Sequence, residues 1–141
     1  MKIRNYLFWA LSLVCTVTAC GQRYKNHNHD NSDKMDTSVI KNRTVKEAID
    51  AFQSSDVPKW LSLFSDDAVL LDDGKPRDFK KFSTKAIQIE KFTSIDKVED
   101  NGTSVYGHFH SDVWGDFKAY FKFQFNEAGK ITKLEIGQAN Y

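Results

Sequence analysis

The segment FKAYFKFQF, residues 117–125, alternates strictly between two sets of side chains. Its odd-numbered positions are Phe117, Ala119, Phe121, Phe123 and Phe125, and its even-numbered positions are Lys118, Tyr120, Lys122 and Gln124. Successive side chains of a strand point to opposite faces of the sheet, so this pattern predicts a strand with one buried and one wet face. The row of phenylalanines needs an apolar layer to cover it, and amphipathic helices elsewhere in the chain are expected to supply that layer.

Three short helices are expected before this strand. In TVKEAIDAF, residues 44–52, Thr44 and Glu47 match a capping box. The apolar residues recur at the spacing of one helical stripe: Val45, Ala48, Ile49 and Phe52. Asp56 is expected to cap a second helix that tolerates Pro58 in its first turn. Trp60, Leu61 and Phe64 supply its buried face, and residues 77–86 suit a third helix with Phe79 and Phe82 as contacts.

Strands are expected mostly after these helices. The apolar run in AVLLDDG, residues 68–74, is a first strand, and longer strands are expected over about 87–99, 103–112, 117–125 and 131–139. Turn residues separate them at Asn101-Gly102, near residues 114–116 and over 126–129. The sequence therefore predicts an α+β domain in which a curved antiparallel sheet wraps around about three N-terminal helices.

The N-terminus indicates export to a bacterial cell envelope. Lys2 and Arg4 precede an apolar segment that is too short to span a bilayer, and the segment ends in VTAC. This ending resembles a bacterial lipobox, which implies a signal peptide over 1–19 and a lipid on Cys20. Whether the membrane is the inner or the outer one stays open. Acyl chains would hold the mature chain on a membrane surface.

The cysteines and charges exclude several kinds of function. Cys15 lies in the expected signal peptide, so lipidation of Cys20 leaves no thiol for disulfides, thiol catalysis or zinc binding. The chain has a net charge of +1, and loss of Lys2 and Arg4 leaves −1, which provides no field to attract nucleic acid. Residues 20–43 are polar and predict a flexible tether, and residues 44–141 are the expected folded domain.

The segment WLSLFSDDAVLLDDG follows the first expected helix, and the segment FQFNEAGKITKLEI lies near the end of the chain. These two segments resemble the nuclear transport factor 2-like superfamily, which includes the SnoaL-like cyclases and ketosteroid isomerase, and the resemblance covers about residues 44–141. It implies a cone-shaped fold with an apolar pocket, and it specifies fold better than reaction. The pocket-lining residues that it implies are Phe52, Trp60, Leu70, Phe121 and Phe123.

Among the carboxylates around the first strand, Asp72 is the candidate catalytic residue. The resemblance aligns Asp72 with the proton-shuttling aspartate of ketosteroid isomerase, and a carboxylate at an apolar pocket is a better base. The same alignment puts Ala48 and Phe121 where that enzyme has its oxyanion donors, so isomerisation by the familiar mechanism is not expected. Asp66, Asp67 and Asp73 are interpreted as turn and solvation residues.

His108 and His110 are the other catalytic candidates, and two orientations remain open. If their face looks inward, either could pair with Asp72 as a dehydratase-like acid–base couple. If the face with Val105 and Phe109 looks inward instead, the histidines lie outside, beside Lys118 and other residues of the neighbouring strand. Both orientations remain open because a shift of one residue in the turn exchanges the two faces of the strand. Alternate spacing alone is weak support for a metal site, so neither a metal nor a cofactor is predicted.

The leading interpretation is therefore a membrane-anchored domain that binds a small apolar or amphipathic ligand, or a protein partner, without strong catalysis. The alternative is a cofactor-independent isomerase, dehydratase or cyclase with Asp72 as general base. A purely structural role is a third interpretation. The wet face of the sheet, with Tyr120 among Lys118, Lys122 and Gln124, could also support a homodimer.

Overall fold

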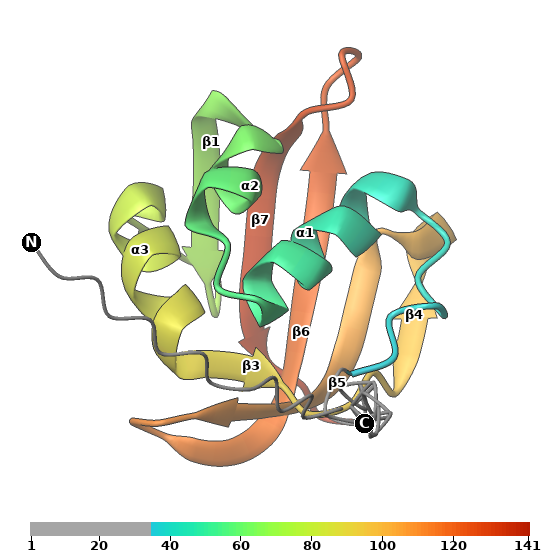
Figure 1. The fold of residues 1–141 in the computed structure, drawn as a ribbon, viewed down its shortest axis with the longest axis vertical. Helices are drawn as coiled ribbons and strands as arrows, with labels where there is room; N and C mark the ends of the chain where they lie inside the picture. The colour runs from blue at the N-terminus through green and yellow to red at the C-terminus, as the bar shows by residue number, and fades with distance from the viewer. Residues whose placement is uncertain (1–34) are drawn as a thin grey trace, which may run out of the picture. The chain divides into compact units, whose positions relative to one another are not determined.

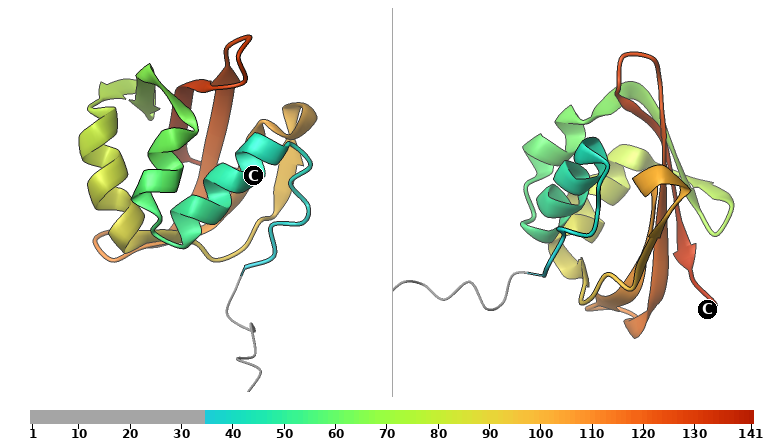
Figure 2. Two further views of the ribbon diagram at one scale, coloured as in Figure 1. Left: turned by 45° about the horizontal axis from the view of Figure 1, so that its top comes forward. Right: turned by 90° about the vertical axis from the view of Figure 1, so that its right-hand side faces the viewer.

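The computed structural model describes residues 35–141, in which three helices lie against one face of a seven-stranded sheet (Figure 1). The helices are α1 (Arg43–Gln53), α2 (Val57–Ser62) and α3 (Phe79–Ile89). The strands are β1 (Phe64–Asp72), β2 (Lys75–Arg77), β3 (Glu90–Phe92), β4 (Lys97–Glu99), β5 (Ser104–Ser111), β6 (Gly115–Phe125) and β7 (Ile131–Gln138), and a 3-10 turn, η1 (Asp100–Gly102), separates β4 from β5. Figure 2 shows the sheet curling around the helices. The predicted α+β class and the curvature are confirmed.

Side-chain caps define where the helices begin. Asp56 accepts a hydrogen bond from the Lys59 amide at 3.0 Å at the start of α2, as predicted. Helix α1 differs from the prediction, because Asn42 is its cap and accepts from the Val45 amide at 3.1 Å. The expected capping box is wrong: helix α1 begins one residue before Thr44, and Glu47 instead forms an ion pair with Lys59 at 2.6 Å.

The packed structure begins before residue 44. Ile40 is 3% exposed and belongs to the hydrophobic core, and Thr37 donates a hydrogen bond to Asp50 at 2.7 Å. Residues 35–42 were expected to be part of the tether, and this boundary is corrected, because an apolar side chain within the polar segment reaches the core. The predicted signal peptide, Cys20 and the rest of the tether lie outside the described residues.

The sheet has the order β2-β1-β7-β6-β5-β3, and β4 also pairs with β5. Strand β1 pairs with β7 in parallel and every other pair is antiparallel, so the predicted purely antiparallel sheet is corrected to a mixed one. The reason is that β2, α3 and the other strands follow β1 before the chain returns as β7 beside it. Both strands then run in the same direction.

The single strand expected over 87–99 is divided. Residues 87–89 end α3, and β3 and β4 pair with separate parts of β5. Between them the chain passes over Gly107, where an added Cβ would lie 1.9 Å from the Ser94 carbonyl oxygen. Only glycine permits this close approach.

The alternation along β6 is confirmed. Ala119, Phe121 and Phe123 are at most 3% exposed, and they face the helices. The Phe121 ring meets Phe52 of α1 edge-on at 5.3 Å, and the fully buried Trp60 of α2 donates its indole N–H to Ser83 at 2.9 Å. Helices α1 and α2 therefore fill the middle of the curved sheet with a dense aromatic core.

Candidate functional site

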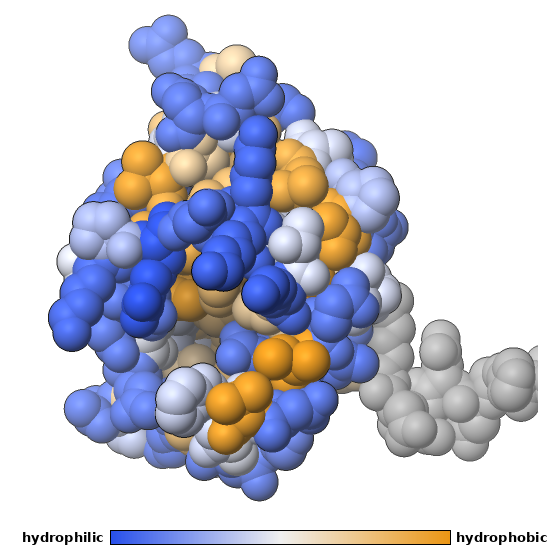
Figure 3. Space-filling model, turned by 90° about the vertical axis from the view of Figure 1, so that its left-hand side faces the viewer, coloured by the Kyte–Doolittle hydropathy of each residue, from blue (hydrophilic) through white to orange (hydrophobic). Residues whose placement is uncertain are grey.

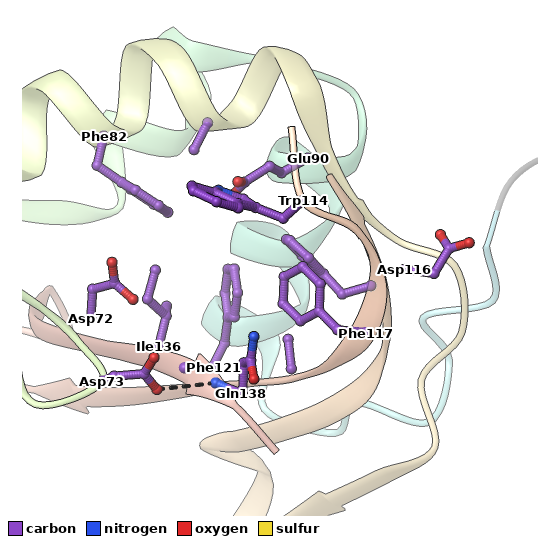
Figure 4. Close-up of a pocket in the computed structure, with 14 residues that line it drawn as sticks. Asp72, Asp73, Phe82, Glu90, Trp114, Asp116, Phe117, Phe121, Ile136 and Gln138 are labelled. Carbon is purple, nitrogen blue, oxygen red and sulfur yellow. Dashed lines mark hydrogen bonds between the residues drawn. The ribbon is translucent and has the colours of Figure 1, made fainter. Parts of the chain in front are cut away.

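A cavity of about 570 Å³ lies between α3 and the curled end of the sheet. Figure 3 shows a hollow on this face, with hydrophobic atoms in its depth and hydrophilic side chains around it. Figure 4 shows side chains that line the cavity. They come from the end of β1, α3, β3, the β5–β6 hairpin and β7: Asp72, Asp73, Phe82, Ala86, Glu90, Phe109, Trp114, Asp116, Phe117, Ala119, Phe121, Ile136, Gly137 and Gln138.

The apolar wall of the cavity is the continuation of the phenylalanine row. Phe117, Ala119 and Phe121 are alternate residues of β6 and therefore share its inner face. Of the predicted pocket residues only Phe121 lines the cavity. The other four are core residues at most 3% exposed: Phe52, Trp60, Leu70 and Phe123. The four residues are not available to a cavity because α1 and α2 pack against this part of the sheet and bury them.

Asp72 lines the cavity at the end of β1, as predicted. The Asp73-Gly74 loop turns the chain immediately after it, and both loop residues have positive φ, which suits an Asp-Gly hairpin turn. The turn brings Arg77 back beside Asp72, and its guanidinium Nε donates to the carboxylate at 3.1 Å. The Asp72 side chain is 35% exposed, so it is a partly shielded, ion-paired group at the rim.

Glu90 is a cavity residue that the sequence analysis missed. It begins β3 opposite Ser111, whose hydroxyl donates to the carboxylate at 3.1 Å. Burial raises the pKa of the Glu90 carboxyl, the Ser111 hydrogen bond offsets part of that rise, and the charge of Asp72 adds to it. Among the described residues, no Lys, Arg or His forms an ion pair with Glu90.

The sequence did contain a signal for Glu90. It stands two residues before the buried Phe92, so both share one face of β3. An acid on the buried face of a strand is uncommon and indicates a partner or a site. The predicted continuous strand over 87–99 concealed this signal, because it left unknown which face of that segment turns inward.

Trp114 forms the edge of the cavity at the tip of the β5–β6 hairpin. It is 76% exposed although it is one of the largest apolar side chains of the domain. The Ser111 hydroxyl oxygen accepts from the amides of Val113 and Trp114 at 3.3 and 3.4 Å. One buried hydroxyl, that of Ser111, therefore connects the backbone of the tip to Glu90.

His108 and His110 lie on the outer face of the sheet, so the predicted couple with Asp72 is not formed. Residues Val105, Gly107 and Phe109 occupy the inner face instead, which is the second of the two orientations considered. His110 contacts Asp116 through Nδ1 at 2.6 Å, and the hydrogen bond with that carboxylate raises the pKa of the imidazole. No group of three potential metal ligands occurs within residues 35–141.

Beside His108, the outer face carries a cluster around Asp96. The carboxylate accepts from the hydroxyls of Ser94 and Tyr141 at 2.7 Å each and contacts His108 Nδ1 at 2.9 Å. The hydrogen bonds of Ser94 and Tyr141 lower the pKa of Asp96 to about 2, whereas burial and Asp96 raise that of Tyr141 to about 12. Lys118 lies 4.3 Å from the Tyr141 ring. The homodimer contact expected on this face stays a prediction.

Comparisons with known proteins identify the fold. No protein-family model and no curated protein matches the chain. Solved structures do match. A nuclear transport factor 2-like protein of unknown function from Cytophaga hutchinsonii has 15% identity and a TM-score of 0.55, over 68% of this chain and 87% of that one. A protein from Xanthomonas campestris described as a polyketide cyclase has 18% identity and a TM-score of 0.51, over the same shares.

The orange carotenoid protein of Anabaena (Nostoc), in a structure binding canthaxanthin, also matches, with 21% identity and a TM-score of 0.55. The match covers 69% of this chain and 35% of the carotenoid protein, so it concerns one part of that larger molecule. At these identities the likeness shows the fold alone. The described domain has the nuclear transport factor 2-like fold, as its two sequence segments indicated.

Proposed function

We propose that the chain is a ligand-binding domain that takes a small apolar or amphipathic molecule into the cavity beside α3. The observation that carries the proposal is an open cavity of about 570 Å³ in a domain whose centre is otherwise densely packed. Small-molecule sites have volumes of roughly 300–1,000 Å³, apolar walls and a few convergent polar groups. The phenylalanine wall with Asp72 and Glu90 corresponds to that description.

The neighbours support this function as an analogy. The carotenoid protein is a case in which the same fold occurs in a protein that binds an apolar molecule. The polyketide cyclase description belongs to the Xanthomonas protein and supports the enzymatic alternative equally. The choice between binding and catalysis therefore depends on the polar groups of this cavity and on experiments with this chain.

Ligand binding is tested with the neutral fluorophore N-phenyl-naphthylamine, whose emission rises in apolar surroundings. We expect saturable binding to the native chain. Ala86→Phe, which fills the cavity from α3, should abolish binding, whereas Ala128→Phe in the exposed turn between β6 and β7 should leave it unchanged. Equal binding by both variants, or none by the native chain, would contradict the proposal.

We also propose that Cys20 is lipidated and holds the domain at a membrane of the bacterial cell envelope. The support is the basic and apolar N-terminus that ends in VTAC. Within residues 35–141, none of the helices has the length and apolar character needed to cross a bilayer. Cys20→Ser should leave an uncleaved or soluble chain with a changed intact mass, and Cys15→Ser should do neither. Normal maturation together with membrane association of Cys20→Ser would refute the anchor.

A cofactor-independent isomerase, dehydratase or cyclase is the second candidate function. It is favoured by two cavity carboxylates in unlike surroundings, because Asp72 has an arginine partner and Glu90 has a raised pKa and a hydroxyl partner. Such a difference divides the roles of general base and general acid. A panel of enolisable ketones and β-hydroxy ketones tests it, and activity should require both Asp72 and Glu90. Turnover that survives in Asp72→Asn and Glu90→Gln would exclude this pair.

A further inference from the structure

We infer that the cavity beside α3 selects a ligand that carries an ammonium group on an apolar body, and that Glu90 binds the ammonium group. The inference rests on the proposed function, because it specifies the charge of the molecule that the cavity takes. It is carried by the combination of an aromatic cavity and a carboxylate in its wall that has no cationic partner among the described residues.

The charged residues that line the cavity are all acidic. Its described lining contains Asp72, Asp73, Glu90 and Asp116, and it contains no Lys, Arg or His. Three of these acids have partners at the rim, in the lining or on the outer face of the sheet. Asp72 pairs with Arg77, Asp73 accepts from the Gln138 amide at 3.1 Å, and Asp116 pairs with His110 and points away from the cavity (Figure 4).

Glu90 differs from these three residues. Asp72 and Asp116 pair with Arg77 and His110, and Asp73 is exposed, whereas Glu90 is half-buried and its partner is the neutral hydroxyl of Ser111, which donates to Oε1. A carboxylate in apolar surroundings is normally paired with a cation, because its loss of hydration is otherwise uncompensated. Burial raises the pKa of Glu90, and the neighbouring charge of Asp72 acts in the same direction, as expected for an acid that has no cationic partner within residues 35–141.

An ammonium group would complete this arrangement. Its N–H groups can donate to the Glu90 carboxylate, and charge-assisted hydrogen bonds of this kind are stronger than neutral ones. An anionic ligand of the same size would bring a third negative charge beside Glu90 and Asp72 with no cation in the lining to receive it. Fatty acids and similar amphiphiles should therefore be rejected even where their apolar part fits.

Trp114 supports the same ligand class. It lines the cavity together with Glu90, and both are held by the Ser111 hydroxyl, which fixes the hairpin tip next to the carboxylate. The face of an indole ring attracts cations, and tryptophan is the strongest aromatic partner for ammonium groups. Phe117 and Phe121 then provide the wall for the apolar body of the ligand.

The test uses three probes with one apolar body: phenylbutylamine, phenylbutanol and phenylbutanoate, measured by calorimetry against the full chain at neutral pH. We expect the amine to bind roughly tenfold more tightly than the alcohol, and the carboxylate to bind most weakly. Glu90→Gln should remove the preference for the amine over the alcohol. Glu127→Gln, which removes an exposed acid outside the cavity, should keep the preference.

The outcomes separate this inference from the proposed function. Equal affinity for the amine and the alcohol, or tightest binding of the carboxylate, would overturn the ammonium inference and leave a ligand-binding cavity. An amine preference that persists in Glu90→Gln would overturn the role of Glu90. Failure of all three probes to bind would overturn the inference and count against the proposed function, which the naphthylamine experiment then decides separately. The native chain alone decides charge selection, so a folding defect in a variant does not obscure it.

Discussion

The two faces of the β5–β6 hairpin treat charge in opposite ways. On the outer face Asp96 accepts from Ser94 and Tyr141 and contacts His108, while His110 lies against Asp116. On the inner face Ser111 meets Glu90, which has no cation among the described residues and lies beside an aromatic cavity. On the outer face each of these carboxylates is paired with a histidine, as in an ordinary solvated surface. The inner charge of Glu90 has no cationic partner among the described residues, and this contrast is the basis of the proposed binding site.

The largest expected effect tests whether the inner face of β6 is buried and its outer face is not. Phe121→Ala should lower the free energy of unfolding by about 3–5 kcal/mol, because it removes a ring that is 2% exposed and contacts three other aromatic rings at 5.0–5.7 Å. Gln124→Ala, on the outer face of the same strand, should stay within about 0.5 kcal/mol of the native chain. Urea denaturation measures both. Comparable losses would mean that β6 does not have one buried face.

The next effect concerns the hydroxyl that connects Glu90 to the hairpin tip. Ser111→Ala should destabilise the domain by about 1–3 kcal/mol, since it leaves buried polar partners unsatisfied. Amide hydrogen exchange at Val113 and Trp114 should become faster, while exchange along the rest of β6 is preserved. Ser38→Ala is the matched exposed control. Unchanged exchange at the tip would show that Ser111 does not hold it.

A smaller effect uses pH to contrast the two faces. The pKa of Glu90 is higher in the folded than in the unfolded chain, so its contribution to stability falls as pH rises from about 4.5 through the folded pKa. Glu90→Gln should remove this fall and gain stability relative to the native chain across that range. Thermal unfolding against pH measures the effect, with Glu127→Gln as the control. Parallel curves for the native chain and Glu90→Gln would contradict the burial of Glu90.

The smallest expected effect concerns Asp96 on the outer face, whose pKa is shifted in the direction opposite to that of Glu90. The pKa of Asp96 is lowered to about 2, so its contribution is present above 3.8 and is lost as pH falls toward 2. Tyr141→Phe removes one of the two hydroxyls that hydrogen-bond the carboxylate and should raise its pKa toward the ordinary value. Carboxyl-carbon NMR measures the titration, with Tyr106→Phe as the control. An unchanged titration in Tyr141→Phe would remove Tyr141 from the cluster.

Much of the fold followed from the sequence because local patterns carry it. The period of two in residues 117–125 identified β6 and its buried face, the Asp56 cap identified α2, and Asp-Gly identified the turn after β1. The site followed less well. Asp72 was placed correctly at the cavity, but the other three acids of the lining were not assigned to it: Asp73, Glu90 and Asp116. Four of the five predicted pocket residues are core residues instead.

The sequence by itself determined which residues of each strand share a face, because side-chain alternation is a property of the backbone alone. It did not determine which face turns inward. The pairing of β3 and β6 with β5, and the crossing of the chain over Gly107, put Glu90 inside and both histidines outside. Only the tertiary structure decided this, since register is set by contacts between residues distant in the sequence. The same long-range packing closes the space under α1 and α2 and leaves the cavity beside α3. Glu90 lies in the lining of this cavity, without a cationic partner among the described residues.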